Sequence, residues 1–208
     1  MRLARLIAVV SLCRLVAACS AGQPQPITAD AFDFPLQPPR VAADFLWHQK
    51  IVVTLGEKRS KYEVYVGKQD DTLSVVGLTP LGTTWLEIVQ RGLEVTYRSA
   101  LPDALPFPPR AIIEDIQRSY FPFTSDPPLK DGTRRFKIGQ EEVEETWSDG
   151  ELKEREFHRG STIAVKVLYE RWPRPGRDGS LVLVNERFGY QLEISTIDMT
   201  ADRMQGAG

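Results

Sequence analysis

The sequence contains very little of the chemistry that most enzymes use. Its 208 residues include only 2 cysteines and 2 histidines. It has no Gly-x-Ser-x-Gly elbow, no His-Glu-x-x-His helix and no Gly-rich phosphate loop. The sequence therefore predicts no catalytic residue, no metal site and no cofactor, and we expect a protein that is not an enzyme. A weaker alternative is a hydrolase that uses His48 or His158, which would need a serine or carboxylate within hydrogen-bond reach.

The sequence also lacks an apolar run long enough for a membrane-spanning helix, which needs about 20 residues. Residues 3–18 are largely apolar but too short to span a membrane. Arg2 and Arg5 give this end of the sequence a basic start. A basic start, an apolar middle and small residues before a cut are typical of a secretory signal. The stretch ends in Leu-Val-Ala-Ala-Cys and resembles a bacterial lipobox, in which the thiol of Cys19 is diacylated, the preceding peptide is removed and the new amino terminus is acylated.

This pattern predicts a lipoprotein signal peptide over residues 1–18 and a lipid anchor on Cys19. Because Cys13 leaves with the signal, no disulfide or free thiolate would remain in the mature chain. Ser20 after the lipidated cysteine favours the outer membrane, with the folded part facing the periplasm. The alternative is an ordinary secretory signal in which the cysteine is incidental. Arg14 places a charge inside the apolar stretch and counts against the lipobox.

The chain has no excess of basic residues. Removing residues 1–18 leaves 23 basic against 28 acidic residues, a net charge of about −5. This balance argues against a nucleic-acid partner and against a polybasic hold on anionic lipid. The lipid itself would have to anchor the protein, since each buried methylene contributes about 0.8 kcal/mol.

Proline, glutamine and alanine dominate residues 19–40, which we interpret as a lipidated tether. Residues 41–200 are long enough for a single domain with a sizeable core, and residues 201–208 read as a flexible tail. Within the domain, a short helix is expected from Val41 to Gln49.

Alternation of apolar and polar residues, with turn clusters about every ten residues, predicts an antiparallel sheet that curls or closes. The expected strands are 51–55, 62–66, 73–78, 83–90, 93–98, 134–138, 142–147, 151–158, 162–171, 180–187 and 190–197. Between the two sets, Pro109 begins a predicted helix that runs to about Tyr120 and stops before Pro122. Its isoleucines at 112, 113 and 116 share one face with Tyr120, so the helix should pack on the concave side of the sheet.

The inward-facing apolar residues have two interpretations, a filled core or an apolar cavity between the sheet and the helix. The candidate cavity residues are Ile51, Val53, Tyr62, Val64, Val75, Leu86, Ile88, Ile112, Ile116, Val165, Val167, Leu192 and Ile194. The acidic stretch from Glu141 to Glu156 is interpreted as the solvated face of two strands. Its alternative role is a surface for a cation or a basic partner.

Several motifs, in order, resemble the LolB family of outer-membrane lipoproteins, which receive other lipoproteins and insert them. The loop Leu78–Thr84 reads Leu-Thr-Pro-Leu-Gly-Thr-Thr and is similar to the Asn-Pro-Leu-Gly-Ser-Thr loop of that family. Tyr62 lies about one strand upstream. A proline-led helix ending in Tyr-Phe-Pro follows, and then a late Gly-Tyr-Gln-Leu-Glu-Ile from Gly189. Within this LolA/LolB-like superfamily, the chain most resembles an uncharacterised group of small lipoproteins often encoded near aryl-polyene biosynthesis genes.

The resemblance implies a mainly β fold, a half-open curved antiparallel sheet or barrel of about 10–11 strands with helices lidding an apolar cavity. It also implies that Leu81 protrudes and helps to place cargo in the membrane, with Pro80 and Gly82 shaping the loop. The alternative is that the leucine folds back onto the core. The helix charges Glu114 and Asp115 depart from the family pattern, so the cargo need not be a lipoprotein.

The leading functional hypothesis is an outer-membrane lipoprotein that binds an apolar chain and helps to transfer it to the outer membrane. That chain would be a lipid, a lipoprotein acyl group or an aryl-polyene lipid, and a periplasmic carrier protein is a possible partner. The alternative is a structural or adaptor lipoprotein with a filled core, which docks a partner through Glu141–Glu156. The volume beneath the helix distinguishes the two hypotheses.

Overall fold

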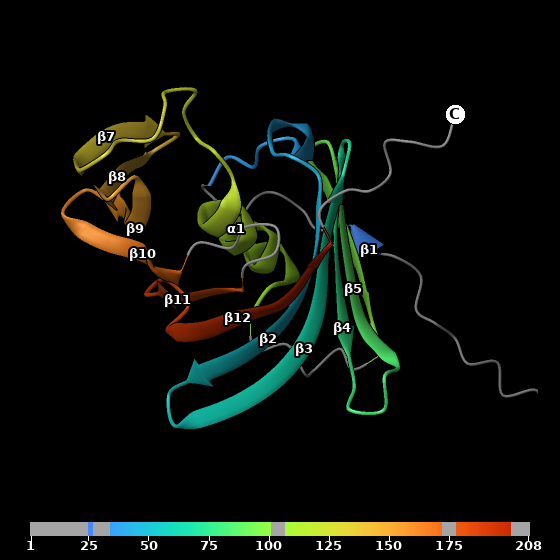
Figure 1. The fold of residues 1–208 in the computed structure, drawn as a ribbon. Coiled ribbons are helices and arrows are strands. Elements are labelled where there is room, and N and C mark those ends of the chain that lie inside the picture. The colour runs from blue at the N-terminus through green and yellow to red at the C-terminus, as the bar shows by residue number, and fades with distance from the viewer. Residues whose placement is uncertain (1–24, 27–33, 101–106, 172–177, 201–208) are drawn as a thin grey trace, which may run out of the picture.

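The computed structural model describes residues 25–26, 34–100, 107–171 and 178–200 (Figure 1). The predicted signal peptide, Cys19, most of the tether and the predicted tail lie outside the described residues. Among the described residues, no helix is long and apolar enough to cross a membrane.

Twelve strands form one antiparallel sheet, in the order β1-β6-β5-β4-β3-β2-β12-β11-β10-β9-β8-β7. The strands are β1 Gln25–Pro26, β2 Phe45–Leu55, β3 Lys58–Gln69, β4 Thr72–Leu78, β5 Thr84–Arg91, β6 Glu94–Ser99, β7 Gly132–Ile138, β8 Glu141–Ser148, β9 Glu151–Arg159, β10 Thr162–Arg171, β11 Gly179–Asn185 and β12 Tyr190–Thr200. The pairing order begins at β1 and ends at β7 and does not close on itself. The predicted mainly β fold with a half-open, curved antiparallel sheet is therefore confirmed, and the two-residue β1 is an addition to it.

The order divides the sheet into two meanders that meet at its centre. The first runs from β2 outward to β6 and the second from β7 inward to β12, and each joins neighbours in sequence. Strands β2 and β12 pair along most of their length, with Leu192 opposite Val53 and Ile194 opposite Ile51. The segment between the meanders contains the helix, so it must cross from one edge of the sheet to the other.

The helix α1 spans Pro109–Tyr120, as predicted. Proline at its first position costs no hydrogen bond, and Phe121, with extended backbone, ends it one residue before the second proline. A second, 3-10 helix is a single turn at Pro39–Val41.

The expected helix from Val41 to Gln49 is wrong, since Phe45 already begins β2. Gln49 pairs with Val64 on β3 and with Thr196 on β12, so this segment has hydrogen-bonded neighbours on both sides. Long-range pairing overrides a weak local helical pattern here.

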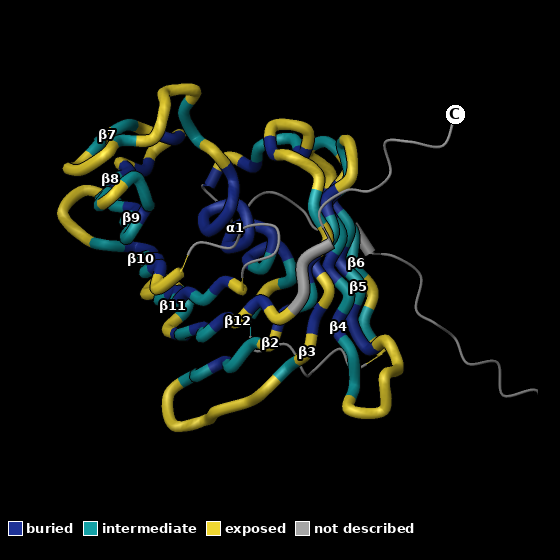
Figure 2. Tube along the Cα trace, in the orientation of Figure 1, coloured by how far each residue is buried: buried dark blue, intermediate teal, exposed yellow. Residues whose placement is uncertain are grey.

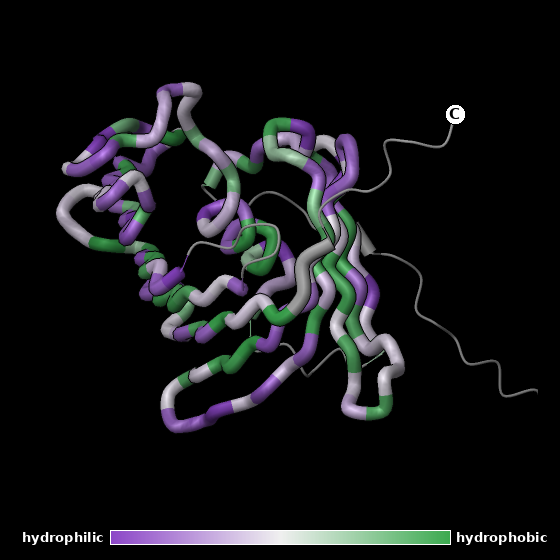
Figure 3. Tube along the Cα trace, viewed as in Figure 1, coloured by the Kyte–Doolittle hydropathy of each residue, from purple (hydrophilic) through white to green (hydrophobic). Residues whose placement is uncertain are grey.

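The sheet curves around α1, which lies on its concave side (Figure 1). Figure 2 shows the helix as a mainly buried element inside this curve. On the predicted apolar face, Ile113, Ile116 and Tyr120 are buried and Ile112 is half-buried. Six polar side chains of the helix are also buried: Arg110, Glu114, Asp115, Gln117, Arg118 and Ser119. Figure 3 accordingly shows hydrophilic as well as hydrophobic positions along this interior helix. The helix therefore makes an apolar interface on one side and a polar one on the other.

Candidate functional site

An apolar cavity of about 80 Å³ lies between α1 and the concave face of the sheet. It is lined by Gln49, Ile51, Val53, Tyr62, Val64, Val66, Val75, Trp85, Leu86, Phe107, Ile112, Asp115, Ile116, Ser119, Tyr120, Leu192 and Ile194. These residues come from α1, from β2 to β5 and from β12, apart from Phe107, which lies just before α1. The volume equals about five to eight water-sized spheres at 10–15 Å³ each. The cavity thus has room for a short apolar segment, and a longer chain requires the walls to move.

Ten of the thirteen candidate cavity residues line this cavity. The other three, Ile88, Val165 and Val167, are fully buried in the packed core and do not reach it. On β3, Val66 also lines the cavity. It lies within the predicted strand 62–66 and continues the alternation of Tyr62 and Val64, but the candidate cavity residues did not include it.

Trp85 reaches the cavity through an irregularity that sequence alternation does not reveal. The register between β4 and β5 shifts after Gly77, and Trp85 and Leu86 are consecutive yet both buried. A bulge of this kind turns two neighbouring side chains to one face. Gly77 makes room for the indole, because a Cβ there would lie 2.9 Å from Trp85 Nε1.

The lining includes the buried polar groups of Gln49, Asp115, Ser119 and Tyr120, and three of these four side chains are hydrogen-bonded. Gln49 Nε2 donates to Tyr120 Oη at 3.0 Å and to Thr196 Oγ1 at 3.1 Å. Asp115 accepts from Asn185 Nδ2 at 3.2 Å and from the Tyr190 hydroxyl.

The fourth, Ser119, is buried, and its hydroxyl has no hydrogen-bond partner among the described residues. Burial raises the pKa of Asp115 to about 6, against the opposing effect of the nearby Arg118 guanidinium. The cavity is therefore apolar with a small polar region along α1.

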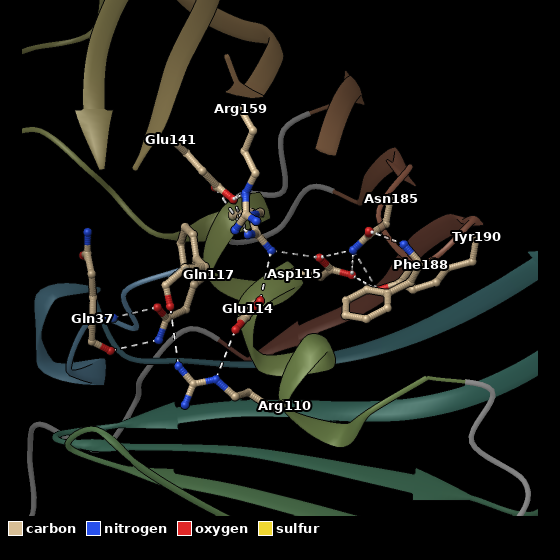
Figure 4. Close-up of polar contacts among 12 residues, drawn as sticks. Gln37, Arg110, Glu114, Asp115, Gln117, Glu141, Arg159, Asn185, Phe188 and Tyr190 are labelled. Carbon is tan, nitrogen blue, oxygen red and sulfur yellow. Dashed lines mark hydrogen bonds and ion pairs between the residues drawn. The ribbon is translucent and has the colours of Figure 1, made fainter. Parts of the chain in front are cut away.

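A chain of buried ion pairs covers the other side of α1 (Figure 4). Arg110 contacts Glu114 at 3.1 Å, Arg118 lies 3.4 Å from Glu114 and 3.1 Å from Glu141, and Arg159 lies 3.3 Å from Glu141. Burial raises the pKa of Glu114, and its two arginine neighbours oppose that rise. These contacts connect α1 to β8 and β9.

The interpretation of Glu141–Glu156 as a solvated face is correct for only one side of these strands. Glu141 and Glu145 are buried, at 1% and 2% exposure, and point toward the helix. Arg155 donates to Glu145 at 2.6 Å and to the Arg118 carbonyl at 2.6 Å. The sequence pattern does not show that Glu141 and Glu145 face inward, because their matching charges come from elsewhere in the fold: Arg118 on α1 pairs with Glu141 and Arg155 on β9 pairs with Glu145.

The two histidines lie on the outer face of the sheet, away from the cavity. His48 Nε2 is 2.5 Å from Glu63 Oε1, and the ring stacks on Tyr65. His158 Nε2 is 3.1 Å from Glu156 Oε2. Each therefore has the carboxylate that the hydrolase hypothesis requires, but neither belongs to the cavity lining. Among the described residues, no cluster of three or more His, Cys, Asp or Glu could hold a metal ion.

The β4–β5 loop presents Leu81 to solvent with 91% of the residue exposed. Thr79 and Thr83 close the loop: the Thr79 amide donates to the Thr83 carbonyl at 2.9 Å, and the two hydroxyls are 2.6 Å apart. The Gly82 amide donates to the Thr79 carbonyl at 2.8 Å, and Gly82 adopts φ +77°, which favours glycine. The leucine does not fold back onto the core.

A second cavity of about 340 Å³ lies between the segment after α1 and strands β7 to β9. Its lining mixes aromatic residues such as Phe123 and Trp147 with Arg134, Glu145 and Arg155. Arg134 donates to the backbone carbonyls of Asp126 and Pro127. This mixed wall is less suited to a purely apolar ligand than the cavity beneath α1.

A family model described as "Protein of unknown function (DUF3261)" matches residues 46–198. No curated protein matches the chain. Among solved structures, a putative outer membrane lipoprotein-sorting protein domain from Vibrio parahaemolyticus is 14% identical, with a TM-score of 0.43 over 79% of this chain and 87% of that chain.

Two further structures are similar. The LolA superfamily protein NE2245 from Nitrosomonas europaea is 14% identical, with a TM-score of 0.48 over 80% of this chain and 91% of that chain. A DUF1329 family protein from Desulfovibrio piger is 10% identical, with a TM-score of 0.49 over 81% of this chain and 89% of that chain.

Proposed function

Because the chain belongs to the DUF3261 family of proteins of unknown function, we propose its role from its own geometry: it binds an apolar chain and passes it to a membrane. One observation carries this proposal: β4 and β5 both line the apolar cavity, and the exposed Leu81 loop joins these two strands. Leu86 on β5 lines the cavity, and Leu81 lies five residues before it. A ligand leaving the cavity at this end would meet the loop.

Burial of the ligand supplies the driving force for binding. Transfer of apolar surface out of water contributes about 25 cal/mol per Å², or about 0.8 kcal/mol for each methylene. The walls that contact the ligand are almost entirely apolar, so no nucleotide or catalytic group is needed. In this proposal the chain is a LolA/LolB-like carrier and no enzyme.

The proposal includes the membrane address predicted by the sequence. Lipidation of Cys19 would hold the domain at the outer membrane, facing the periplasm, and would bring Leu81 to the lipid surface. The cargo would be a lipid, a lipoprotein acyl group or an aryl-polyene lipid, received from a periplasmic carrier protein.

The test is to purify the protein from its native envelope and identify bound lipid by mass spectrometry. Val75→Phe would fill the cavity, since Val75 lines it at 3% exposure. Val76→Phe, on the opposite face of the same strand, is the matched control. We expect bound lipid with the parent protein and with Val76→Phe, and its loss with Val75→Phe.

The small volume of the cavity, about 80 Å³, favours a second candidate function, a structural or adaptor lipoprotein without ligand. The outward carboxylates on β8 and β9 would form its docking face, although Glu154 and Glu156 already contact Lys166 at 2.6 and 2.8 Å. Absence of lipid from all three proteins in the experiment above would reject the carrier proposal and leave the adaptor. Lipid retained equally by Val75→Phe would mean that this cavity is not the binding site.

A further inference from the structure

Ser119 is one of the residues that line the cavity, and within the described part of the chain the fold leaves its hydroxyl without a hydrogen bond. The residue is 1% exposed, and its Oγ has no partner among the described residues. Its backbone carbonyl does have a partner, since the Tyr169 hydroxyl donates to it at 2.8 Å. A buried hydroxyl without a hydrogen bond destabilises a fold, so its presence calls for a physical reason.

The neighbouring polar groups do not satisfy this hydroxyl. A helical serine often bonds the carbonyl four residues earlier, but no such bond forms from Ser119. The Gln49 amide is engaged by Tyr120 and Thr196, and the Asp115 carboxyl by Asn185 and Tyr190. Among the described residues, Ser119 therefore retains hydrogen-bonding capacity that no protein group uses, next to the cavity.

The surroundings of Ser119 also restrict the charge of that ligand. Asp115 lies one helical turn earlier on the same face and lines the same cavity. A ligand carboxylate at Ser119 would be placed near this carboxylate in an enclosure with little water, which is unfavourable for like charges. A neutral group that accepts or donates a hydrogen bond avoids this repulsion.

We propose that Ser119 Oγ hydrogen-bonds a neutral polar group carried by the apolar ligand, such as a hydroxyl or an ester carbonyl. The ligand class is then a long-chain alcohol or ester, and neither a bare hydrocarbon nor a free fatty acid. This inference rests on the proposed function, because it assigns the polar end of the ligand that the same cavity binds.

The experiment measures affinity for three probes with the same tail, octan-1-ol, octane and octanoate, on lipid-free full-length protein. Ser119→Ala removes only the hydroxyl, and Ser74→Ala, on the outer face of β4, is the matched control. One neutral hydrogen bond predicts that Ser119→Ala weakens octanol binding by about 2- to 10-fold. Octane binding should not weaken, and the parent protein should bind octanoate less tightly than octanol at neutral pH.

Thermal unfolding without ligand gives an independent measurement. Because the free hydroxyl is unsatisfied, Ser119→Ala should raise the melting temperature of the empty protein, whereas loss of a structural hydrogen bond would lower it. Unchanged octanol affinity, an equal loss for octane or a lowered melting temperature would each overturn the inference and leave the carrier proposal standing. Failure of the parent protein to bind any of the three probes would instead count against the proposed function.

Discussion

Arg118 on α1 and Glu141 on β8 form a buried ion pair, with 3.1 Å between Nη2 and Oε1 and side chains only 3% and 1% exposed. The same guanidinium lies over the ring of Phe34, 4.1 Å from its centroid. Glu114 and Asp115 also lie within ion-pair distance of it. This single cation therefore compensates three buried carboxyl groups between the helix and the second meander.

Replacing Arg118 by alanine should destabilise the protein strongly. The change would leave Glu114, Asp115 and Glu141 without their shared cation, and breaking a buried pair in this way costs about 3–5 kcal/mol. Urea denaturation measures the loss in the free energy of unfolding. Arg135→Ala is the control, because Arg135 contacts Glu144 at 2.6 Å on the exposed face and should change little. Similar losses in both variants would contradict the role given to burial.

Leu81→Glu should reduce transfer of an apolar probe from the protein to lipid vesicles. Removing a leucine from a membrane contact costs about 1.5–3 kcal/mol, so a decrease of about tenfold or more is expected. Folding should be unaffected, since the side chain touches mainly solvent. Leu93→Glu is the matched control, because Leu93 is 61% exposed in the turn at the opposite end of β5. Equal transfer by both variants would show that Leu81 does not contact the membrane.

Asp115→Asn should remove a pH-dependent component of stability. The pKa of Asp115 is about 6 in the fold against 3.8 for an ordinary aspartate, so the folded protein binds this proton more tightly than the unfolded chain. The stability from this carboxyl is thus complete below about pH 3.8 and is lost as the pH rises through about 6. The loss is about 3 kcal/mol.

Denaturation of the parent protein and of Asp115→Asn at about pH 3.5 and about pH 7.5 measures this component. The difference between their free energies of unfolding should move by about 3 kcal/mol in favour of the asparagine variant at the higher pH. Asp126→Asn, an exposed change, should show no such movement. If the difference between the two free energies of unfolding did not change with pH, the pKa of Asp115 would have to be the same in the folded and unfolded chains.

Gly77→Ala should distort the cavity wall. The added Cβ would lie 2.9 Å from Trp85 Nε1, so the indole or the strand must shift, and overpacking of this kind costs about 1–3 kcal/mol. Gly67→Ala on β3 is the control, because its Cβ meets only the end of the flexible Leu46 side chain at 3.3 Å. The free energy of unfolding, measured by denaturation, and the affinity for octane should both change more for Gly77→Ala than for Gly67→Ala. Equal effects would mean that Trp85 is not fixed by this contact.

The sequence was sufficient to predict the sheet and α1 because both depend on local signals. Pro109 at the first helical position and Pro122 beyond the last define the helix, and alternation of side chains defines the strands. Local periodicity identifies only the apolar face of a helix. It does not show that Arg118 would be buried against Glu141, because that contact joins residues 23 positions apart. Ser119 was missed for a different reason: it shares the helix face of Ile112 and Ile116, but a serine does not register in an apolar pattern.

The short pairing of β1 with β6 defines where the tether joins the sheet. Gln25 lies opposite Tyr97, and the pairing is antiparallel. Since β6 is also antiparallel to β5, β1 runs in the direction of β5. Gln25, the first residue of β1, is therefore nearer than Pro26 to the end of the sheet at which β5 begins, which is the end that carries the Leu81 loop.

The register along the two strands gives this arrangement a length scale. Tyr97 is level with Ile88, which lies four residues into β5 from Thr84, or about 13 Å at the rise of a strand. Gln25 is therefore paired about 13 Å back from the start of β5, and the Leu81 loop projects beyond that point along the strand direction.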